Sequence, residues 1–404
     1  MEEKERETTT MDELCPDLID AVLRRVPLLP RTRLKPVSKA WCHHITTLRH
    51  TAPPTSSTGL VISYSEFNDD PKLHRSSLFR IQENSNSLSL ACTPSHSYRW
   101  LVNSCNGLVL YAKTNETHNW VYCVSSPVLN QYRILPQRHK SEILARESLA
   151  FDGSHRGNFK VVSFFFQDID VSGGKIECQI FSSETGGWRE IEAPLINSFL
   201  LLQNGFQVDD ITGQSVYRKG KLYWVWSVCM LVFDEDEESF ELVNLPKSAE
   251  TGERKKKRMC FSYTQLWESD GKINYCESTR EGYRVWKYCD NDYDDDENRW
   301  EAKRLIVLDK LKSREMEVVD LFGERMKVRV SEGMIWPCAF NEDFQLVYFQ
   351  VGPRTIFSYS FETGEFEEIW GSGNPVETQN YFFCYVCPYL FNSVNLVKRE
   401  FDAG

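Results

Sequence analysis

The sequence lacks an apolar run long enough to cross a bilayer. Its longest strongly apolar stretch, LYWVWSVCMLVF, covers residues 222–233, whereas a membrane-spanning helix needs about 20 such residues. We read the stretch as one or two buried strands. The first residues, MEEKERETTTMDE, contain no apolar segment of the kind found in secretory signals. We therefore expect a soluble protein of the nucleus and/or cytoplasm with no membrane partner, in which most of the 13 cysteines are free thiols.

Excess positive charge is also missing. The chain has 47 Lys and Arg against 58 Asp and Glu, which gives a net charge of −11. A general grip on nucleic acid requires a basic surface, so we expect no nucleic-acid partner. The one strong basic cluster is ERKKKR, residues 253–258. It is read as a solvated loop, with a nuclear import signal or an anion-binding patch as the alternatives.

Common catalytic and metal-binding motifs are absent as well. The sequence contains no GxxxxGK[ST], HExxH or GxSxG. Cys384 and Cys387 form the one CxxC, with no second pair and no nearby His to complete a four-ligand zinc site. The acidic stretch 290–297 lacks the spaced ligands and the Gly of a calcium loop. We predict a non-catalytic protein with no catalytic residue, no cofactor and no metal.

What the sequence does have is aromatic residues, at 13% of the chain, in a recurring hairpin pattern. All copies but the loosest place an aromatic residue on either side of a turn. Two copies, QIFSSETGGWREI (179–191) and SYSFETGEFEEIW (358–370), match closely. A third lies in LVFDEDEESFELVNLP, a looser one in CVSSPVLNQYRILP, and a fifth, with an acidic turn, in YCDNDYDDDENRWEAKRLI. Aromatic residues and alternation of this kind favour β-strands.

The hairpins recur at a nearly constant spacing. Their second aromatic residues are Tyr132, Trp188, Phe240, Trp300 and Phe366, which are 52 to 66 residues apart. A period near 50 is typical of the blades of a kelch-type β-propeller. The alternative is a β-sandwich built from unrelated hairpins. We favour a propeller of about six blades because similar hairpins recur five times.

The region before the hairpins has a different periodicity. After Pro16, the apolar residues Leu18, Ile19, Val22, Leu23 and Val26 follow a helical stripe. Pro27, Pro30 and Pro36 divide residues 11–50 into three short predicted helices, and the Pro/Ser/Thr-rich residues 51–59 read as a linker. Three helices this short make a poor independent core, so such a domain needs a partner.

This first region resembles the F-box, the helical module of substrate receptors in SCF-type ubiquitin ligases. The match lies in LCPDLIDAVLRRVP followed by RLKPVSKAW. The resemblance implies that an apolar face docks a Skp-type adaptor, and through it the cullin and the RING subunit. The implied adaptor-binding residues are Leu14, Pro16, Ile19, Leu23, Leu34, Val37 and Trp41. Arg31 and Thr32 stand where the F-box family usually has apolar residues.

The remainder resembles the F-box-associated domain of plant F-box proteins, which implies a propeller-like receptor domain. The match rests on the order and spacing of several segments: SCNGLVLY (104–111), FKVVSFFF (159–166), FSSETGGWRE, VYRKGKLYWV (216–225), LVFDEDEESFELVNLP and FSYSFETGEFEEI (357–369).

The expected architecture is a small all-α F-box at residues 11–50, a linker at 51–59, and a large all-β, propeller-like domain at 60–395. The resemblance implies a substrate-recognition subunit that brings an unknown target protein to the ligase. The alternative function is a propeller-based small-molecule sensor or enzyme with a degenerate F-box. The sequence assigns no residue to target binding.

Overall fold

The computed structural model describes the β-rich part of the chain. By internal contacts the chain divides into two units, residues 1–57 and 58–404. All described residues belong to the second unit: 58–66, 74–81, 88–92, 100–115, 119–138, 145–153, 158–170, 174–200, 211–226, 229–246, 264–269, 271–279, 281–289, 299–319, 325–331, 334–341, 345–352, 355–370, 381–390 and 396. The predicted F-box helices and linker residues 51–57 lie outside them, and the predicted domain boundaries stay predictions.

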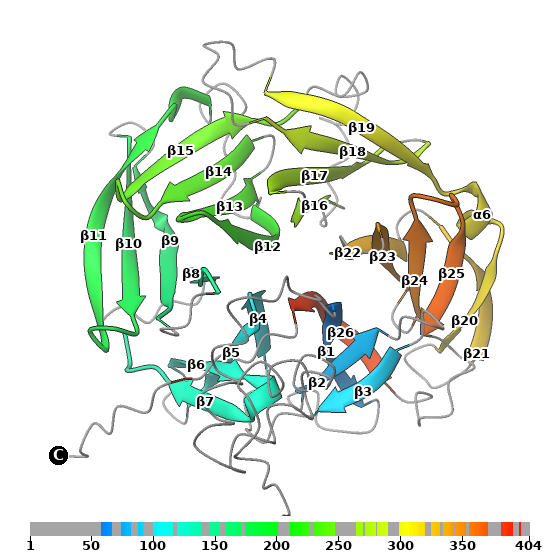
Figure 1. Cartoon of the computed structure of the whole chain (residues 1–404), viewed down its shortest axis with the longest axis horizontal. Helices are drawn as coiled ribbons and strands as arrows, with labels where there is room; N and C mark the ends of the chain where they lie inside the picture. The colour runs from blue at the N-terminus through cyan, green and yellow to red at the C-terminus, as the bar shows by residue number, and fades with distance from the viewer. Residues whose placement is uncertain are drawn as a thin grey trace, which may run out of the picture. The chain divides into compact units, whose positions relative to one another are not determined.

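Most of the described strands form six four-stranded antiparallel units, which we number as blades in chain order (Figure 1). Blade 1 combines β26 (Tyr381–Leu390) with β1 (Thr58–Glu66), β2 (His74–Ile81) and β3 (Leu88–Cys92). Blade 2 contains β4 (Trp100–Cys105), β5 (Leu108–Thr114), β6 (Trp120–Ser126) and β7 (Gln131–Ile134). Blade 3 contains β8 (Ala145–Ala150), β9 (Lys160–Asp170), β10 (Lys175–Ser182) and β11 (Gly187–Ile196).

The other three blades follow the same order. Blade 4 contains β12 (Ile211–Arg218), β13 (Lys221–Trp226), β14 (Cys229–Asp234) and β15 (Ser239–Asn244). Blade 5 contains β16 (Thr264–Ser269), β17 (Lys272–Ser278), β18 (Gly282–Tyr288) and β19 (Trp300–Val307). Blade 6 contains β22 (Ile335–Asn341), β23 (Leu346–Val351), β24 (Thr355–Ser360) and β25 (Phe366–Trp370).

Short elements connect some of these strands. A 3-10 helix, Pro127–Leu129, joins β6 to β7. Between blades 5 and 6 lie α6 (Asp309–Lys312) and a hairpin of β20 (Glu315–Val319) with β21 (Arg325–Arg329). A short parallel pairing of β11 with β15, at Leu195↔Phe240 and Ile196↔Glu241, joins blades 3 and 4 into one sheet. In the described part of the chain no helix is long and apolar enough to span a membrane.

The first strand of each blade contacts the first strand of the next, in the order β26, β4, β8, β12, β16, β22 and back to β26. This closed sequence of contacts is the arrangement of a β-propeller-like domain, as predicted. The C-terminal strand closes the domain by completing the N-terminal blade, because β26 pairs with β1 from Thr58↔Leu390 to Glu66↔Tyr381. The sequence pattern did not reveal this pairing.

The core lies between consecutive blades. Blade 3 packs against a neighbouring blade on both faces, so adjacent residues of a strand contribute to different clusters. Val161 belongs to the cluster between blades 2 and 3, and Val162 to the cluster between blades 3 and 4. Further clusters fill the junctions of blades 4 and 5, 5 and 6, and 6 and 1. Burial on both faces explains the near-continuous apolar runs. The run 222–233 is two buried strands, β13 and β14.

The prolines of the described strands lie in the innermost or outermost strand of their blades. Pro194 is in β11, the outermost strand of blade 3, while Pro337 and Pro388 are in β22 and β26, the innermost strands of blades 6 and 1. An edge tolerates proline because one side of its ladder is unpaired, and β11 pairs with β15 only at Leu195 and Ile196. The sequence positions of these prolines are therefore compatible with the strand order.

Candidate functional site

The five predicted hairpins are the outer pairs of strands in blades 2 to 6. The predicted aromatic pairs face each other across Phe181↔Trp188, Phe233↔Phe240 and Tyr359↔Phe366. Their ring centroids are 5.5, 4.8 and 4.8 Å apart. The acidic copy pairs Tyr288 with Trp300, and the looser copy pairs Ser125 with Tyr132. These hairpin predictions are confirmed.

Three of these hairpins turn in the same way, because their sequences supply the same parts. The residue after the first aromatic is Ser182, Asp234 or Ser360, and its side-chain oxygen accepts a hydrogen bond from the backbone N–H two residues later. Such local bonds are the reason Ser and Asp favour turns. Because strands alternate in direction, these turns and the corresponding turns of the other blades lie at one edge of the sheets, which we call the turn face.

One turn departs from the pattern at Glu238. Five residues after the first aromatic, the backbone is left-handed in all three turns. Two of them have glycine there, Gly186 with φ 78° and Gly364 with φ 71°, whereas Glu238 has φ 49°. A side chain in this conformation costs about 1–2 kcal/mol. The structure therefore places a carboxylate where glycine would be less strained.

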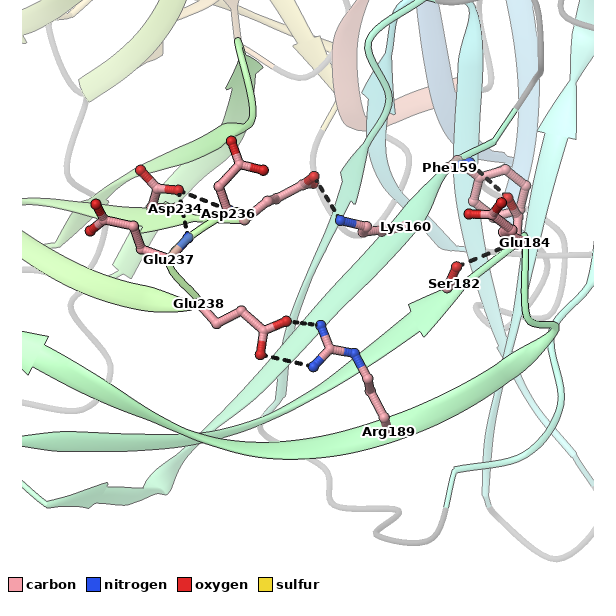
Figure 2. A network of polar contacts seen from close by, with 11 residues as sticks. Phe159, Lys160, Ser182, Glu184, Arg189, Asp234, Asp236, Glu237 and Glu238 are labelled. Atoms are coloured by element: carbon pink, nitrogen blue, oxygen red, sulfur yellow. Dashed lines mark hydrogen bonds and ion pairs between the residues drawn. The ribbon is translucent and has the colours of Figure 1, made fainter.

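Arg189 holds that carboxylate from the neighbouring blade (Figure 2). It starts in β11 of blade 3 and donates two hydrogen bonds to Glu238 of blade 4, one of them from Nη1 to Oε2 at 3.0 Å. These hydrogen bonds hold the pKa of Glu238 below its ordinary value. The same hydrogen bonds raise the pKa of Arg189. The pair is therefore fully charged at neutral pH.

Other acidic residues of this turn are paired from the strands around it. Lys221 Nζ lies 2.9 Å from Asp234 Oδ2. Although burial acts in the opposite direction, hydrogen bonds from Lys221 and from two backbone N–H groups lower the pKa of Asp234. Glu235 accepts a hydrogen bond from Lys160 of blade 3 at 3.0 Å, and burial raises its pKa against the effect of Lys160. Asp236 and Glu237 lie exposed beside them.

The turn face between blades 3 and 4 is therefore an acidic surface that ties the two blades together. Glu184 from the turn of blade 3 and Asp236 and Glu237 from blade 4 project there (Figure 2). Such a surface attracts cationic side chains. Among the residues that the structure describes, no group of His, Cys, Asp and Glu has the arrangement of a metal site.

A second polar cluster is buried between blades 2 and 3. Arg138, in the connection after β7, donates from Nη2 to the Tyr122 hydroxyl at 2.8 Å and from Nη1 to the Ser163 hydroxyl. Its Nη2 lies 3.2 Å from Glu147 Oε1 in β8, which accepts a hydrogen bond from Tyr122. Burial raises the pKa of Glu147, although Arg138 opposes this. The cluster fixes the connection between two blades.

Buried thiols do not add reactive groups. Burial raises the pKa of Cys105, Cys123, Cys178 and Cys229 to about 12. A thiol must ionise to act as a nucleophile or a metal ligand, so these four are protonated core residues at neutral pH. Cys384 and Cys387 lie in β26, where the structure describes the strand and not their side chains.

The predicted adaptor-binding residues lie outside the described part of the chain, as do Arg31 and Thr32, the basic cluster 253–258 and the acidic stretch 290–297. Their roles stay predictions. Sequence reasoning also did not single out Arg138, Glu147 or Arg189. Their partners lie on other blades. The signal that could have found Arg189 is the arginine of WRE (188–190) in one predicted hairpin, followed by the acidic turn DEDEE (234–238) in the next hairpin along the chain.

Comparison with known proteins gives one family over most of the described unit. The model of the F-box associated beta propeller domain matches residues 61–388. Two proteins of Arabidopsis thaliana, both named F-box proteins, are 24% identical to the chain. One aligns over 285 residues, 65% of this chain and 68% of its own length. The other aligns over 260 residues, 59% of this chain and 63% of its own length.

Solved structures resemble the chain only distantly. TolB from Acinetobacter baumannii superimposes with a TM-score of 0.44 at 10% identity, over 85% of this chain and 69% of that one. An acylaminoacyl peptidase of Pyrococcus horikoshii gives a TM-score of 0.35 at 11% identity, over 79% of this chain and 52% of that one. Similarities at this level support no conclusion on function.

Proposed function

The chain belongs to the family of proteins with an F-box associated β-propeller domain, and from this premise we propose that it is the substrate-recognition subunit of an SCF-type ubiquitin ligase. One observation carries the proposal: the family match over residues 61–388 follows an F-box-like sequence at residues 11–50. The names of the two Arabidopsis relatives, both F-box proteins, support it.

In this proposal the two parts of the chain have separate roles. The F-box-like part binds a Skp-type adaptor through Leu14, Pro16, Ile19, Leu23, Leu34, Val37 and Trp41. The propeller-like domain binds a target protein in the nucleus or cytoplasm. Tethering raises the effective concentration of the target's lysines near the ubiquitin-charged enzyme. The chain itself contributes binding and no chemical step.

Recovery of the adaptor with the full-length protein tests the proposal. We expect the intact chain to co-precipitate a Skp-type adaptor and a Leu14→Ala/Pro16→Ala variant to lose it, because both changes remove apolar contact from the predicted docking face. A Glu5→Ala/Thr8→Ala variant, altered before the first predicted helix, is the control.

Equal recovery by the intact chain and the Leu14→Ala/Pro16→Ala variant, or none by either, would contradict the ligase proposal. Ubiquitination of proteins that co-purify only with the intact chain under proteasome inhibition is the second expected result. A small molecule that raises the melting temperature equally with and without residues 1–50 would instead favour the sensor or enzyme alternative.

A further inference from the structure

The chain beyond β26 returns to the propeller at Leu396. This residue is 6% exposed and belongs to the apolar cluster between blades 2 and 3. Its backbone N–H donates a hydrogen bond to Gln131 Oε1 at 3.1 Å. Two independent contacts, one apolar and one polar, therefore hold Leu396 against blades that β26 does not belong to.

The topology places both ends of this return on the turn face. Leu390, the last residue of β26, pairs with Thr58 at the beginning of β1, next to the end of β2. Gln131 begins β7, directly after the turn of the hairpin β6–β7 in blade 2. Six residues can span at most about 20 Å. A chain that leaves blade 1 at Leu390 thus reaches the junction of blades 2 and 3 within that span.

We infer that Leu396 is a second closure of the propeller. The first closure, β26 on β1, depends on one strand pairing within blade 1. Anchoring the chain after β26 to blades 2 and 3 keeps β26 at high effective concentration near β1 whenever that pairing opens. Leu396 therefore stabilises blade 1 although it packs against blades 2 and 3, and its loss weakens the pairing of β26 with β1. The inference does not depend on the proposed function.

Hydrogen exchange on the full-length protein tests this closure. In a Leu396→Asp variant we expect amides of β1 and β26 to exchange at least tenfold faster, while those of blades 4 and 5 keep their rates. Leu396→Ala should give the same pattern more weakly, with a melting temperature lower by roughly 3–7 °C. It also serves where the Asp variant does not fold.

The matched control is Ile134→Asp, on an exposed residue of blade 2, and it should leave all these rates unchanged. A Gln131→Ala variant removes only the polar contact and should shift β1 and β26 in the same direction by a smaller factor. Faster exchange confined to blades 2 and 3, or spread equally over all six blades, would overturn the inference, because Leu396 would then be an ordinary core residue.

Discussion

Each of the two junctions of blade 3 contains an ion pair of an arginine and a glutamate, buried at one junction and exposed at the other. Between blades 2 and 3, Arg138 and Glu147 are 2% and 10% exposed. Between blades 3 and 4, Arg189 and Glu238 are 46% and 40% exposed. In a buried ion pair, desolvation offsets much of the attraction, but removing one partner leaves an unpaired buried charge and costs much stability. An exposed ion pair contributes little to stability. Their consequences for stability should therefore differ widely.

The raised pKa of Glu147 and the lowered pKa of Glu238 express the same difference. Between blades 2 and 3, burial is the main influence on the pKa of Glu147. Between blades 3 and 4, the hydrogen bonds from Arg189 are the main influence on the pKa of Glu238. We read the buried cluster as a device that fixes the position of the connection at residues 135–138, and the exposed pair as a modest link between blades 3 and 4.

The largest expected effect is at the buried junction. Arg138→Met removes the counter-ion of the Glu147 carboxylate and the donor to the Tyr122 and Ser163 hydroxyls. Because a buried carboxylate is left without a cation, we expect the free energy of unfolding to fall by about 3–5 kcal/mol. Urea unfolding followed by tryptophan fluorescence measures it. The double variant Arg138→Met/Glu147→Leu should recover most of the loss. A double variant as unstable as the single one would show that the buried charge is not the cause.

An intermediate effect is expected for Trp188, which also belongs to the junction of blades 2 and 3. Its Nε1–H donates to the Pro136 carbonyl at 2.7 Å. Trp188→Phe keeps most of the apolar contact and removes this bond, which should lower stability by about 1 kcal/mol. The control is Trp300→Phe, because Trp300 donates in the same way to the Asn244 carbonyl at 2.8 Å. Unequal losses in the same unfolding assay would contradict the equivalence of these repeat positions.

The smallest effect is expected at the exposed pair. Glu238→Gln should cost less than about 1 kcal/mol at pH 7, and less still in 1 M salt. Since the folded pKa of Glu238 is lowered, its contribution is present above the unfolded pKa of about 4.3 and disappears as the pH falls through the folded value. Melting temperatures of the two proteins, measured from pH 7 down to pH 2.5, should therefore converge at the acidic end.

Glu238→Gly separates the ion pair from the backbone. It loses both hydrogen bonds from Arg189, of which Gln keeps an acceptor for one, but it introduces the residue that the equivalent turns have at Gly186 and Gly364. It should be more stable than Glu238→Gln by about 1 kcal/mol, because glycine adopts the left-handed conformation without strain. A Gly variant less stable than the Gln variant would show that the turn is not strained.

Local patterns in the sequence predicted a large part of this fold. The aromatic pairs seven residues apart identified three of the outer hairpins, since both strands and their turn lie within one short segment. The pairing of β26 with β1 was not predictable in this way. YFFCYVCPYL has the composition of a buried strand, but its partner TGLVISYSE lies about 300 residues earlier.

The junctions between blades escaped prediction for the same reason. Arg138 contacts Glu147 and Ser163 only because the connection after β7 folds back between two blades. Nothing in LPQRHK marks this arginine as buried. The predicted adaptor-binding residues have a sequence signal of the opposite kind, a specific local match, and they lie in the part of the chain that the structure does not describe.

The pairing of the C-terminal strand β26 with β1 also sets an order of events during synthesis. The ribosome makes residues 11–50 before β1, but the partner strand of β1 ends at Leu390. At 5–20 residues per second, the intervening roughly 300 residues take about 15–60 s. For that time one edge of β1 is open to pairing with other chains. A nascent chain thus exposes its F-box-like segment well before its ring can close, and a premature stop before β26 would release the first without the second.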